Sequence, residues 1–305
     1  MDRGTAIRSL RLAFVFAFVA SVAALAGWTG VAGAGVVVGG GDRDVATRQE
    51  PATESPLEIA TRILGHAPRG LAKTIVERGS ILVANDANYP PYSSVDGSTG
   101  EVEGFDVDVA RGIAAILGVA VEFRHPAWDW VPRGLVRGYF DVSIGSMEIT
   151  PQRKKTVAFS TPYSHLAAQI LIRKGGPRVT GPASLRGRKV GADRGSTYLT
   201  YLRDKTGATP VAFADYSPAV RALLKHEVPM YLTSGVMARL LAGRDDRLAP
   251  SGRPLFWDRC ACAVKKGEAD LVALLDYSLR NLQRDGVIRE SMTRWFGPGD
   301  QGIRP

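Results

Sequence analysis

Short apolar runs alternate with amphipathic segments along most of the chain. The runs at residues 81–84, 119–123 and 140–144 have the length and content of buried strands. Between them, residues 106–118 and 130–136 place apolar side chains three or four positions apart, which is the spacing of a helix. Because strands that alternate with helices pair in parallel, this order predicts an α/β sheet.

The same alternation returns in the second half of the chain, although no sequence repeat relates the two halves. A further helical segment, 58–78, precedes the first strand. The chain of 305 residues therefore fits one large or two medium α/β domains. The pattern in the second half predicts strands at 189–192, 211–213, 230–232 and 260–264, and helices at 196–205, 218–226, 236–242, 269–283 and 287–296.

Residues 1–34 have the features of an export signal. Arg3, Arg8 and Arg11 precede an uncharged apolar stretch, and small residues at candidate cleavage sites follow it. An uncleaved membrane anchor is the alternative, because about 20 apolar residues suffice to span a bilayer. Either interpretation places the rest of the chain outside the cytoplasm, in the periplasm. Residues 35–69 are expected to form a linker with a short helix.

Composition and charge narrow the function only a little. Hydrophobic residues make up 45% of the chain, enough for a packed core, and the net charge of +9 is attributed to a solvated, Arg-rich surface. No run of Lys and Arg is interleaved with aromatic residues, so nucleic acid is not an expected partner. The four histidines are scattered without metal-ligand spacing, so neither a metal nor another cofactor is expected.

The sequence contains two cysteines, Cys260 and Cys262. Two positions apart on a predicted strand, they are too far from each other for an easy disulfide, and zinc normally takes four ligands. We expect two buried thiols, with a disulfide or a metal pair as the alternative.

The segment at residues 150–155 carries the first candidate chemistry. Thr150 can cap a short helix that has Pro151 in its first position. Free backbone N–H groups at such a helix start attract an anion. Arg153 would add a planar, two-pronged donor that matches a carboxylate. The segment therefore predicts a site for a small carboxylate.

Several stretches, taken together in their order and spacing, resemble the polar amino-acid family of periplasmic solute-binding proteins (solute-binding protein family 3). These proteins are the binding components of ABC importers. The resemblance runs from about residue 70 to residue 297. The matching stretches are 81–92 (ILVANDANYPPY), 104–110 (GFDVDVA), 140–155 (FDVSIGSMEITPQRKK), 159–163 (FSTPY), 263–267 (AVKKG) and 285–297 (DGVIRESMTRWFG).

The resemblance implies the two-lobed type II periplasmic-binding-protein fold of the α/β class. Each lobe would be a mixed sheet flanked by helices, and two hinge strands would join the lobes. Lobe one would contain residues 70–165 and 260–301, and lobe two residues 166–259. The ligand would bind in the cleft between them, and the lobes would close around it by hinge motion, as is general for periplasmic binding proteins.

The resemblance assigns carboxylate contacts to both lobes. Arg153 matches the family arginine that binds the α-carboxylate of the ligand, and Ser146 matches a residue whose backbone and hydroxyl face the ligand. Ser196 and Thr197 match a turn at a helix start in lobe two that donates to the same carboxylate. Ordinary helix capping is the alternative for these hydroxyl residues.

Other positions would hold the rest of the ligand. Tyr89 and Trp128 match positions that sandwich its side chain, because flat rings hold apolar or cationic groups; packing in the core is the alternative for Trp128. Asp86 matches an acidic position at the rim of the cleft that can select cationic side chains. Thr150 in the carboxylate motif and Asp193, a further acid near the lobe-two turn, complete the expected contacts.

Two positions depart from the family pattern. Ser234 stands where the family usually has an Asp that binds the ligand ammonium, and a hydroxyl cannot replace that charge. Glu148 stands where Ser or Thr is usual. Glu148 could take over the ammonium, which is the favoured interpretation, or the ligand could lack an α-ammonium. In a third interpretation, Glu148 pairs internally with Arg153 or another base and narrows the site.

The implied function is capture of a small carboxylate-bearing ligand, an amino acid or related polar metabolite, for an inner-membrane ABC permease. The protein would be a monomer without catalytic residues. A sensory or accessory module of the same fold is one alternative. The other is a cyclohexadienyl-dehydratase-like enzyme, which needs a carboxylic acid for elimination. Residues 228–242 contain no such acid, although Glu148 or Asp193 could substitute.

Overall fold

The computed structural model describes residues 54–298. The predicted export signal, most of the predicted linker and the last residues of predicted lobe one lie outside the described residues. Within residues 54–298, none of the helices combines the length and the apolar content that crossing a membrane requires.

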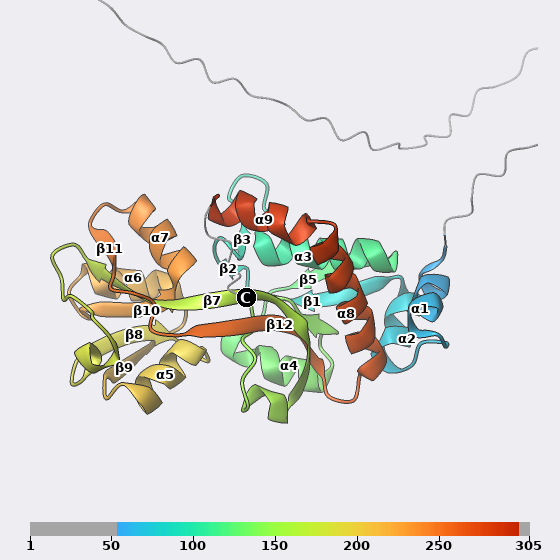
Figure 1. The fold of residues 1–305 in the computed structure, drawn as a ribbon, viewed down its shortest axis with the longest axis horizontal. Coiled ribbons are helices and arrows are strands. Elements are labelled where there is room, and N and C mark those ends of the chain that lie inside the picture. Colours follow the sequence, from blue (N-terminus) through green and yellow to red (C-terminus); the bar gives the residue numbers. More distant parts are fainter. Residues whose placement is uncertain (1–53, 299–305) are drawn as a thin grey trace, which may run out of the picture. The chain divides into compact units, whose positions relative to one another are not determined.

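Two long antiparallel strands connect the two halves of the described structure. They are β7 (Val157–Arg173) and β12 (Trp257–Lys265), and they pair along the whole length of β12. At one end β12 also pairs with β6, and at the other end β7 pairs with β10 and β11. Two lobes are thus joined by these two strands (Figure 1), which confirms the two-lobed type II fold.

Lobe one is built on strands that pair in parallel, as the sequence predicts. β1 lies between β5 and β6, with Leu82 opposite Glu122 and Val83 opposite Val142. Helices α3 and α9 lie on one side of this sheet and α4 on the other (Figure 1). The strands are β1 (Ser80–Ala84), β5 (Ala120–Arg124) and β6 (Val142–Ser143), with a separate small sheet of β2 (Asn88–Tyr89), β3 (Ser93–Val95) and β4 (Val102–Glu103); the helices are α3 (Phe105–Leu117), α4 (Val131–Arg137), α8 (Ala269–Arg284) and α9 (Val287–Phe296), with the 3-10 turns η1 (Trp128–Trp130) and η2 (Arg153–Lys155).

Lobe two repeats the parallel arrangement on the other end of β7. β10 lies between β7, to which it is antiparallel, and β8, to which it is parallel, and β9 follows β8. Its strands are β8 (Lys189–Asp193), β9 (Thr209–Phe213), β10 (Met230–Ser234) and β11 (Leu248–Ser251), and its helices are α5 (Thr197–Lys205), α6 (Tyr216–Leu224) and α7 (Gly235–Arg244), with the 3-10 turn η3 (Pro182–Leu185).

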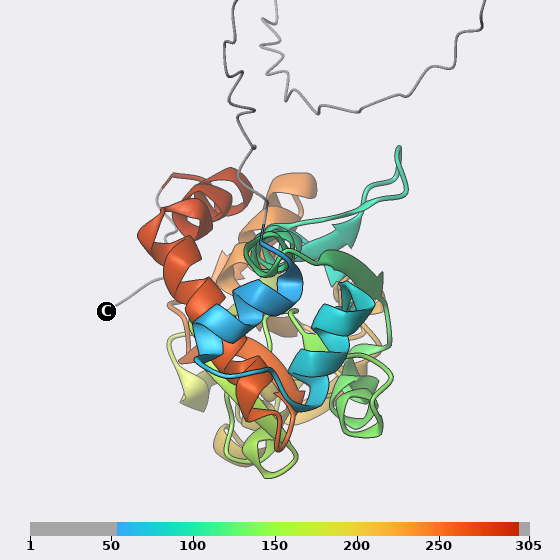
Figure 2. The ribbon, with the colours of Figure 1, turned by 90° about the vertical axis from the view of Figure 1, so that its right-hand side faces the viewer.

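Two helices precede the first strand, where the sequence predicts one. α1 (Pro56–Leu64) begins at Ser55, which forms a capping box with Glu58. Gly65 ends α1 with a φ of 76°, a left-handed conformation that glycine adopts readily. The chain then resumes as α2 (Gly70–Arg78). Both helices pack against α8 at the far end of lobe one (Figure 2).

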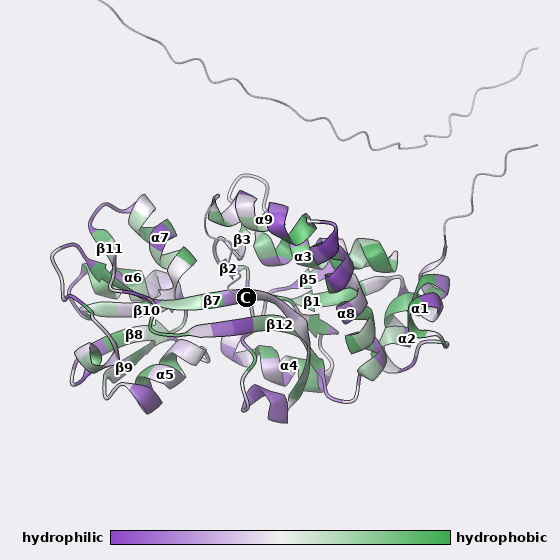
Figure 3. Ribbon diagram, viewed as in Figure 1, coloured by the Kyte–Doolittle hydropathy of each residue, from purple (hydrophilic) through white to green (hydrophobic). Residues whose placement is uncertain are grey.

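Apolar residues concentrate on the strands and on the inner sides of the helices, and hydrophilic residues on the outer sides (Figure 3). Ile81 and Ile113 are fully buried in lobe one, and Ile170 in lobe two. Cys260 and Cys262 are buried in β12 with free thiols. This confirms the prediction of two buried thiols.

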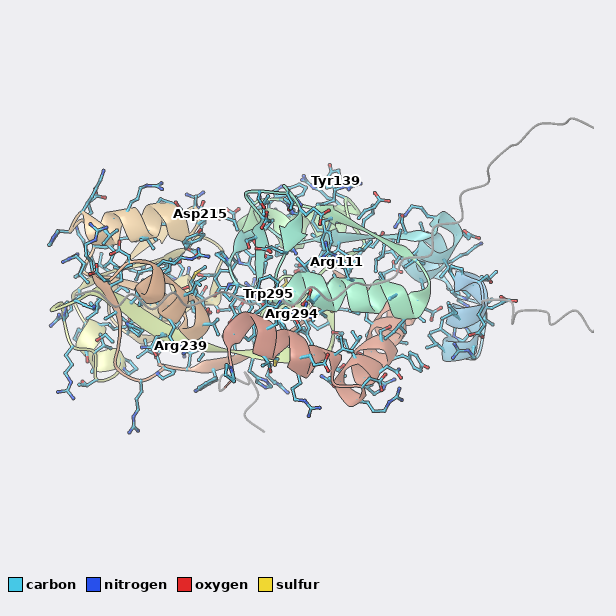
Figure 4. The ribbon with its side chains drawn as sticks, turned by 90° about the horizontal axis from the view of Figure 1, so that it is seen from above. Arg111, Tyr139, Asp215, Arg239, Arg294 and Trp295 are labelled. Carbon is cyan, nitrogen blue, oxygen red and sulfur yellow. The ribbon has the colours of Figure 1, made fainter. Side chains whose placement is uncertain are left out.

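The carboxylate of Asp108 fixes the C-terminal helix to α3. Its Oδ2 accepts hydrogen bonds from Ser291 Oγ at 2.7 Å and from Trp295 Nε1 at 2.9 Å. Arg294 Nη1 lies 3.3 Å from the same oxygen. Figure 4 places Arg294 and Trp295 where α9 meets α3. One carboxylate on α3 therefore satisfies three donors on α9.

Replacing Asp108 with Ala should destabilise the protein, because the buried hydroxyl of Ser291 and the indole N–H of Trp295 lose their acceptor. An unsatisfied buried group costs about 1–3 kcal/mol, so urea denaturation should show a loss of that size. Asp204→Ala is the control, because within residues 54–298 the hydrogen bonds of that exposed carboxylate come from its neighbour Arg203. We expect no measurable change for the control; equal losses in the two variants would contradict the assignment.

Candidate functional site

A pocket lies between the two lobes and contains about 490 Å³ of space, part of it open to solvent. Both lobes contribute to its walls. The residues that line it are Asp86, Asn88, Tyr89, Trp128, Gly145, Ser146, Glu148, Leu166, Asp193, Ser196, Tyr198, Ala214 and Asp215.

The wall from lobe one is formed by segments that follow parallel strands. Asp86 comes shortly after β1, and Ser146 and Glu148 come shortly after β6. Ligand sites of open α/β sheets lie outside these carboxyl ends of strands. Trp128 stands at the start of η1, and its ring lies 5.5 Å from the guanidinium carbon of Arg153.

Ser146 is held in place by a buried hydrogen-bond network. It has a φ of 52°, which is uncommon for a residue other than glycine. Its hydroxyl donates to Asp106 Oδ1 at 3.0 Å, and its backbone N–H donates to Tyr163 Oη at 2.9 Å. Tyr163 donates in turn to Asp106 Oδ1 at 2.8 Å. Burial raises the pKa of Asp106 to about 7.

The wall from lobe two is formed by the ends of β8 and β9 and the helices that follow. Ser196 caps α5, where its hydroxyl accepts from Leu199 N at 3.1 Å. Asp215 caps α6 and lies at the edge of lobe two that faces lobe one (Figure 4). The hydroxyl of Tyr231 donates to Asp193 at 2.9 Å and so orients that carboxyl group.

The pocket is strongly acidic. Its lining includes the carboxyl groups of Asp86, Glu148, Asp193 and Asp215, and none of the described residues that line it is Lys, Arg or His. Removal from bulk water raises the pKa of Asp86 to about 6 and that of Asp193 to about 7. Repulsion from Asp215 contributes to both increases. A cation in this pocket would find several partners, whereas an anion would be repelled.

Arg153 is engaged by the protein itself. Its Nη1 donates to Glu148 Oε2 at 2.6 Å and to the carbonyl oxygen of Glu148 at 2.9 Å. Its Nη2 donates across to the carbonyl oxygen of Gly195 in lobe two at 3.1 Å. The other oxygen of Glu148, Oε1, accepts from Thr197 Oγ1 in lobe two at 3.0 Å. The ion pair therefore links the two lobes.

This geometry differs from the favoured interpretation of Glu148 and matches the third, internal pairing with Arg153. It also leaves Arg153 outside the lining of the pocket. The sequence, in contrast, predicts that Arg153 is available to bind the carboxylate of a ligand. The physical reason is that Glu148 lies only five positions before Arg153, so its carboxylate can reach the guanidinium group. Glu148 nevertheless lines the pocket, so the pair forms part of its wall.

Seven of the eleven predicted site residues line the pocket, and Arg153, Thr150, Thr197 and Ser234 do not. Thr150 Oγ1 accepts from Arg153 N at 3.1 Å, and η2 is only a single 3-10 turn. Ser234 is fully buried and caps α7 by accepting from Met237 N at 3.1 Å. The seven residues that line the pocket are Ser146, Glu148, Tyr89, Trp128, Asp86, Ser196 and Asp193.

Several lining residues were not predicted from the sequence. Tyr198 follows the predicted turn residues by one position, and its hydroxyl lies 3.4 Å from that of Tyr89 in the other lobe. Asp215 precedes a predicted helix, and its acidic side chain is the one feature of the sequence that could have indicated a place in the site. The lining also includes four residues whose side chains are neither charged nor aromatic, so the sequence does not single them out: Asn88, Gly145, Leu166 and Ala214.

Two α/β lobes, two connecting strands and a pocket between the lobes define the class of bacterial solute-binding proteins. The family model described as "Bacterial extracellular solute-binding proteins, family 3" matches residues 81–298. The chain belongs to this family. Helices α1 and α2 precede the matched segment.

Several similar proteins are named as amino-acid-binding proteins. The L-cystine-binding protein TcyJ of Escherichia coli K12 is 31% identical over 234 residues, which cover 76% of this chain and 88% of TcyJ. A crystal structure of a mutant of ArgBP from T. maritima superposes with a TM-score of 0.70 at 30% identity, covering 74% of this chain and 98% of that one. The ancestral amino acid-binding protein AncCDT-1, a precursor of cyclohexadienyl dehydratase, has a TM-score of 0.70 at 28% identity, covering 74% and 100% of the two chains.

Proposed function

We propose that this protein captures a small organic cation in the pocket between its lobes, in the periplasm, and delivers it to an inner-membrane ABC permease. One observation carries the proposal: besides Glu148, which is paired with Arg153, the carboxyl groups of Asp86, Asp193 and Asp215 line the pocket, and its described lining residues include no basic side chain. Membership of the solute-binding family and the names of the relatives support the transport role. The same relatives favour a binding protein over an enzyme.

The lobes are proposed to close around the cation as a hinge. Residues 70–165 with 260–298 would move against residues 166–259, with β7 and β12 flexing between them. A cation between Asp86 of lobe one and Asp193 and Asp215 of lobe two would attract both lobes at once. Because these contacts improve when the lobes approach, ligand binding would favour the closed state.

The charge of the ligand can be tested by calorimetric titration of the pure protein. L-arginine, agmatine and putrescine represent cations, glutamine a neutral amino acid and glutamate an anion. We expect binding by at least one of the cations and none by glutamate. Tight binding of glutamate, or of glutamine in preference to every cation, would overturn the proposal.

Binding of a cation should weaken as the pH falls. Asp86 and Asp193 take up protons below pH values of about 6 and about 7, and each loses the charge that attracts the ligand. Between about pH 8 and about pH 5.5 we expect the affinity for agmatine to fall by about tenfold or more. Asp193→Asn should lower the affinity at the higher pH and flatten the profile. Affinity that is constant or rises on acidification would contradict this prediction.

Closure can be tested at Gly195, where the lobes touch. A Cβ at Gly195 would lie 2.8 Å from the Cα of Asp129 in lobe one. Gly187 is a matched control, since its φ of 69° resembles the 77° of Gly195 and a Cβ there meets no atom within 4 Å. Both Ala variants should lose about 1–2 kcal/mol of stability from backbone strain.

Only Gly195→Ala should also weaken ligand binding and increase the radius of gyration of the liganded protein in X-ray scattering. The added methyl group would keep the lobes apart, whereas Gly187→Ala leaves their contact unchanged. Equal affinities for the two variants would argue against closure at this contact.

A further inference from the structure

We propose that Glu148 supplies an internal carboxylate to Arg153 in place of a carboxylate on the ligand. The pocket would then select organic cations that carry no carboxylate, namely amines, amidines and guanidines, over the corresponding amino acids. This inference rests on the proposed function and specifies the chemical class of its ligand.

The first support is that three of the five N–H donors of Arg153 are already used by the protein. Nη1 serves both the carboxylate and the carbonyl oxygen of Glu148, and Nη2 serves the carbonyl oxygen of Gly195. One face of the guanidinium lies over the ring of Trp128. The side chains of Arg153 and Glu148 are only 11% and 5% exposed, so water does not compete freely for the pair.

The second support is that both oxygens of Glu148 are used, and by opposite lobes. Oε2 accepts from Arg153 of lobe one and Oε1 accepts from Thr197, the first residue of α5 in lobe two. An arginine and a helix start together make a site for a carboxylate. In this structure the carboxylate at that site comes from the chain itself.

The third support is electrostatic. A ligand carboxylate that entered the pocket would lie among Asp86, Asp193 and Asp215 and beside the Glu148–Arg153 ion pair, and no described lining residue is basic. To take the position of Glu148 at Arg153 it would have to displace that buried carboxylate and leave it without its partner. A buried charge that loses its partner is strongly unfavourable. A ligand without a carboxylate avoids both costs.

The remaining groups of the pocket suit such a cation. Asp86 stands on one lobe and Asp193 and Asp215 on the other, so a positive group can meet carboxylates from both sides. The rings of Tyr89 and Trp128 line the same space and can hold the apolar part of the ligand or a second positive group. The pocket therefore offers partners for every part of an alkyl amine or guanidine.

The experiment compares pairs of ligands that differ by a carboxylate: agmatine with L-arginine, cadaverine with L-lysine, and putrescine with L-ornithine. For wild-type protein, titration calorimetry should show the amine of at least one pair binding about tenfold or more tighter than its amino acid. L-argininamide, which has an uncharged amide in place of the carboxylate, should bind closer to agmatine than to L-arginine. An amino acid that binds as tightly as its amine, or more tightly, in every pair would overturn the inference.

Glu148→Thr tests the residue itself. Removing the internal carboxylate should free Arg153 and shift the ratio of the two affinities toward the amino acid by about tenfold or more. Adding Arg153→Ala to this variant should abolish the shift. If Glu148→Thr does not fold, the nearly isosteric Glu148→Gln should shift the ratio in the same direction.

Asp86→Asn is the matched control. It removes one negative charge from the same pocket, and none of its described hydrogen bonds involves Arg153. It should weaken both members of a pair and, because it removes only part of the repulsion on a ligand carboxylate, shift their ratio much less than Glu148→Thr does. A shift in the ratio as large as that of Glu148→Thr would attribute selectivity to pocket charge alone and contradict the inference.

The two proposals fail in different ways. Tight binding of cationic amino acids with weak binding of their amines would overturn the role of Glu148 and leave the cation-binding function intact. Binding of none of these cations, in a protein that is folded by circular dichroism, would overturn both.

Discussion

The antiparallel pairing of β7 with β12 is the interaction on which the rest of this structure depends. The sheet of lobe one reaches β12 through β6, and the sheet of lobe two reaches β7 through β10. The same pairing also positions the site. Met147 and Ile149 form backbone hydrogen bonds with Ala261 and Arg259 of β12, at 3.1 Å and 2.9 Å. Glu148, between them, is therefore held beside the hinge by bonds that need no ligand.

Ionised carboxyl groups in the pocket are energetically unfavourable unless a positive charge lies beside them. Asp86 and Asp193 are removed from bulk water and repelled by Asp215, so their ionised forms are disfavoured. A cation removes this penalty and at the same time attracts carboxylates from both lobes. In the proposed function, recognition and closure would thus share one electrostatic origin, whereas the Glu148–Arg153 pair links the lobes through groups of the protein alone.

The sequence predicts the parallel strands and most helices, because their apolar spacing is regular. It does not reveal β7 as one strand of 17 residues. Pro162 and polar residues interrupt its apolar pattern, and its partner strands β10 and β12 lie far from it in the sequence. The single helix predicted before β1 is wrong for a local reason, since Gly65 takes a left-handed conformation there.

The site shows the same division between local and long-range information. Asp86 and Ser146 could be predicted because the local stretches that contain them match the family pattern, and Asp193 because it is an acid near the predicted lobe-two turn. The sequence does not determine which groups Arg153 binds, because the acceptors of Arg153 include Gly195 O, 42 positions away in the other lobe. Tyr198 and Asp215 also enter the pocket through the approach of the lobes, which no periodicity in the sequence records.

The position of Ser234 shows how the acidic groups of lobe two are arranged. Ser234 ends β10, is fully buried, and uses its hydroxyl to cap α7, so it does not line the pocket. The acids stand instead at the neighbouring strands, because Asp193 ends β8 and pairs in register with Phe213 of β9, two positions before Asp215. The hydroxyl of Tyr231 on β10 turns Asp193 by donating to both of its oxygens. The negative charge of lobe two is therefore centred at the ends of β8 and β9 rather than at β10, and a bound cation would be drawn toward that edge of the sheet.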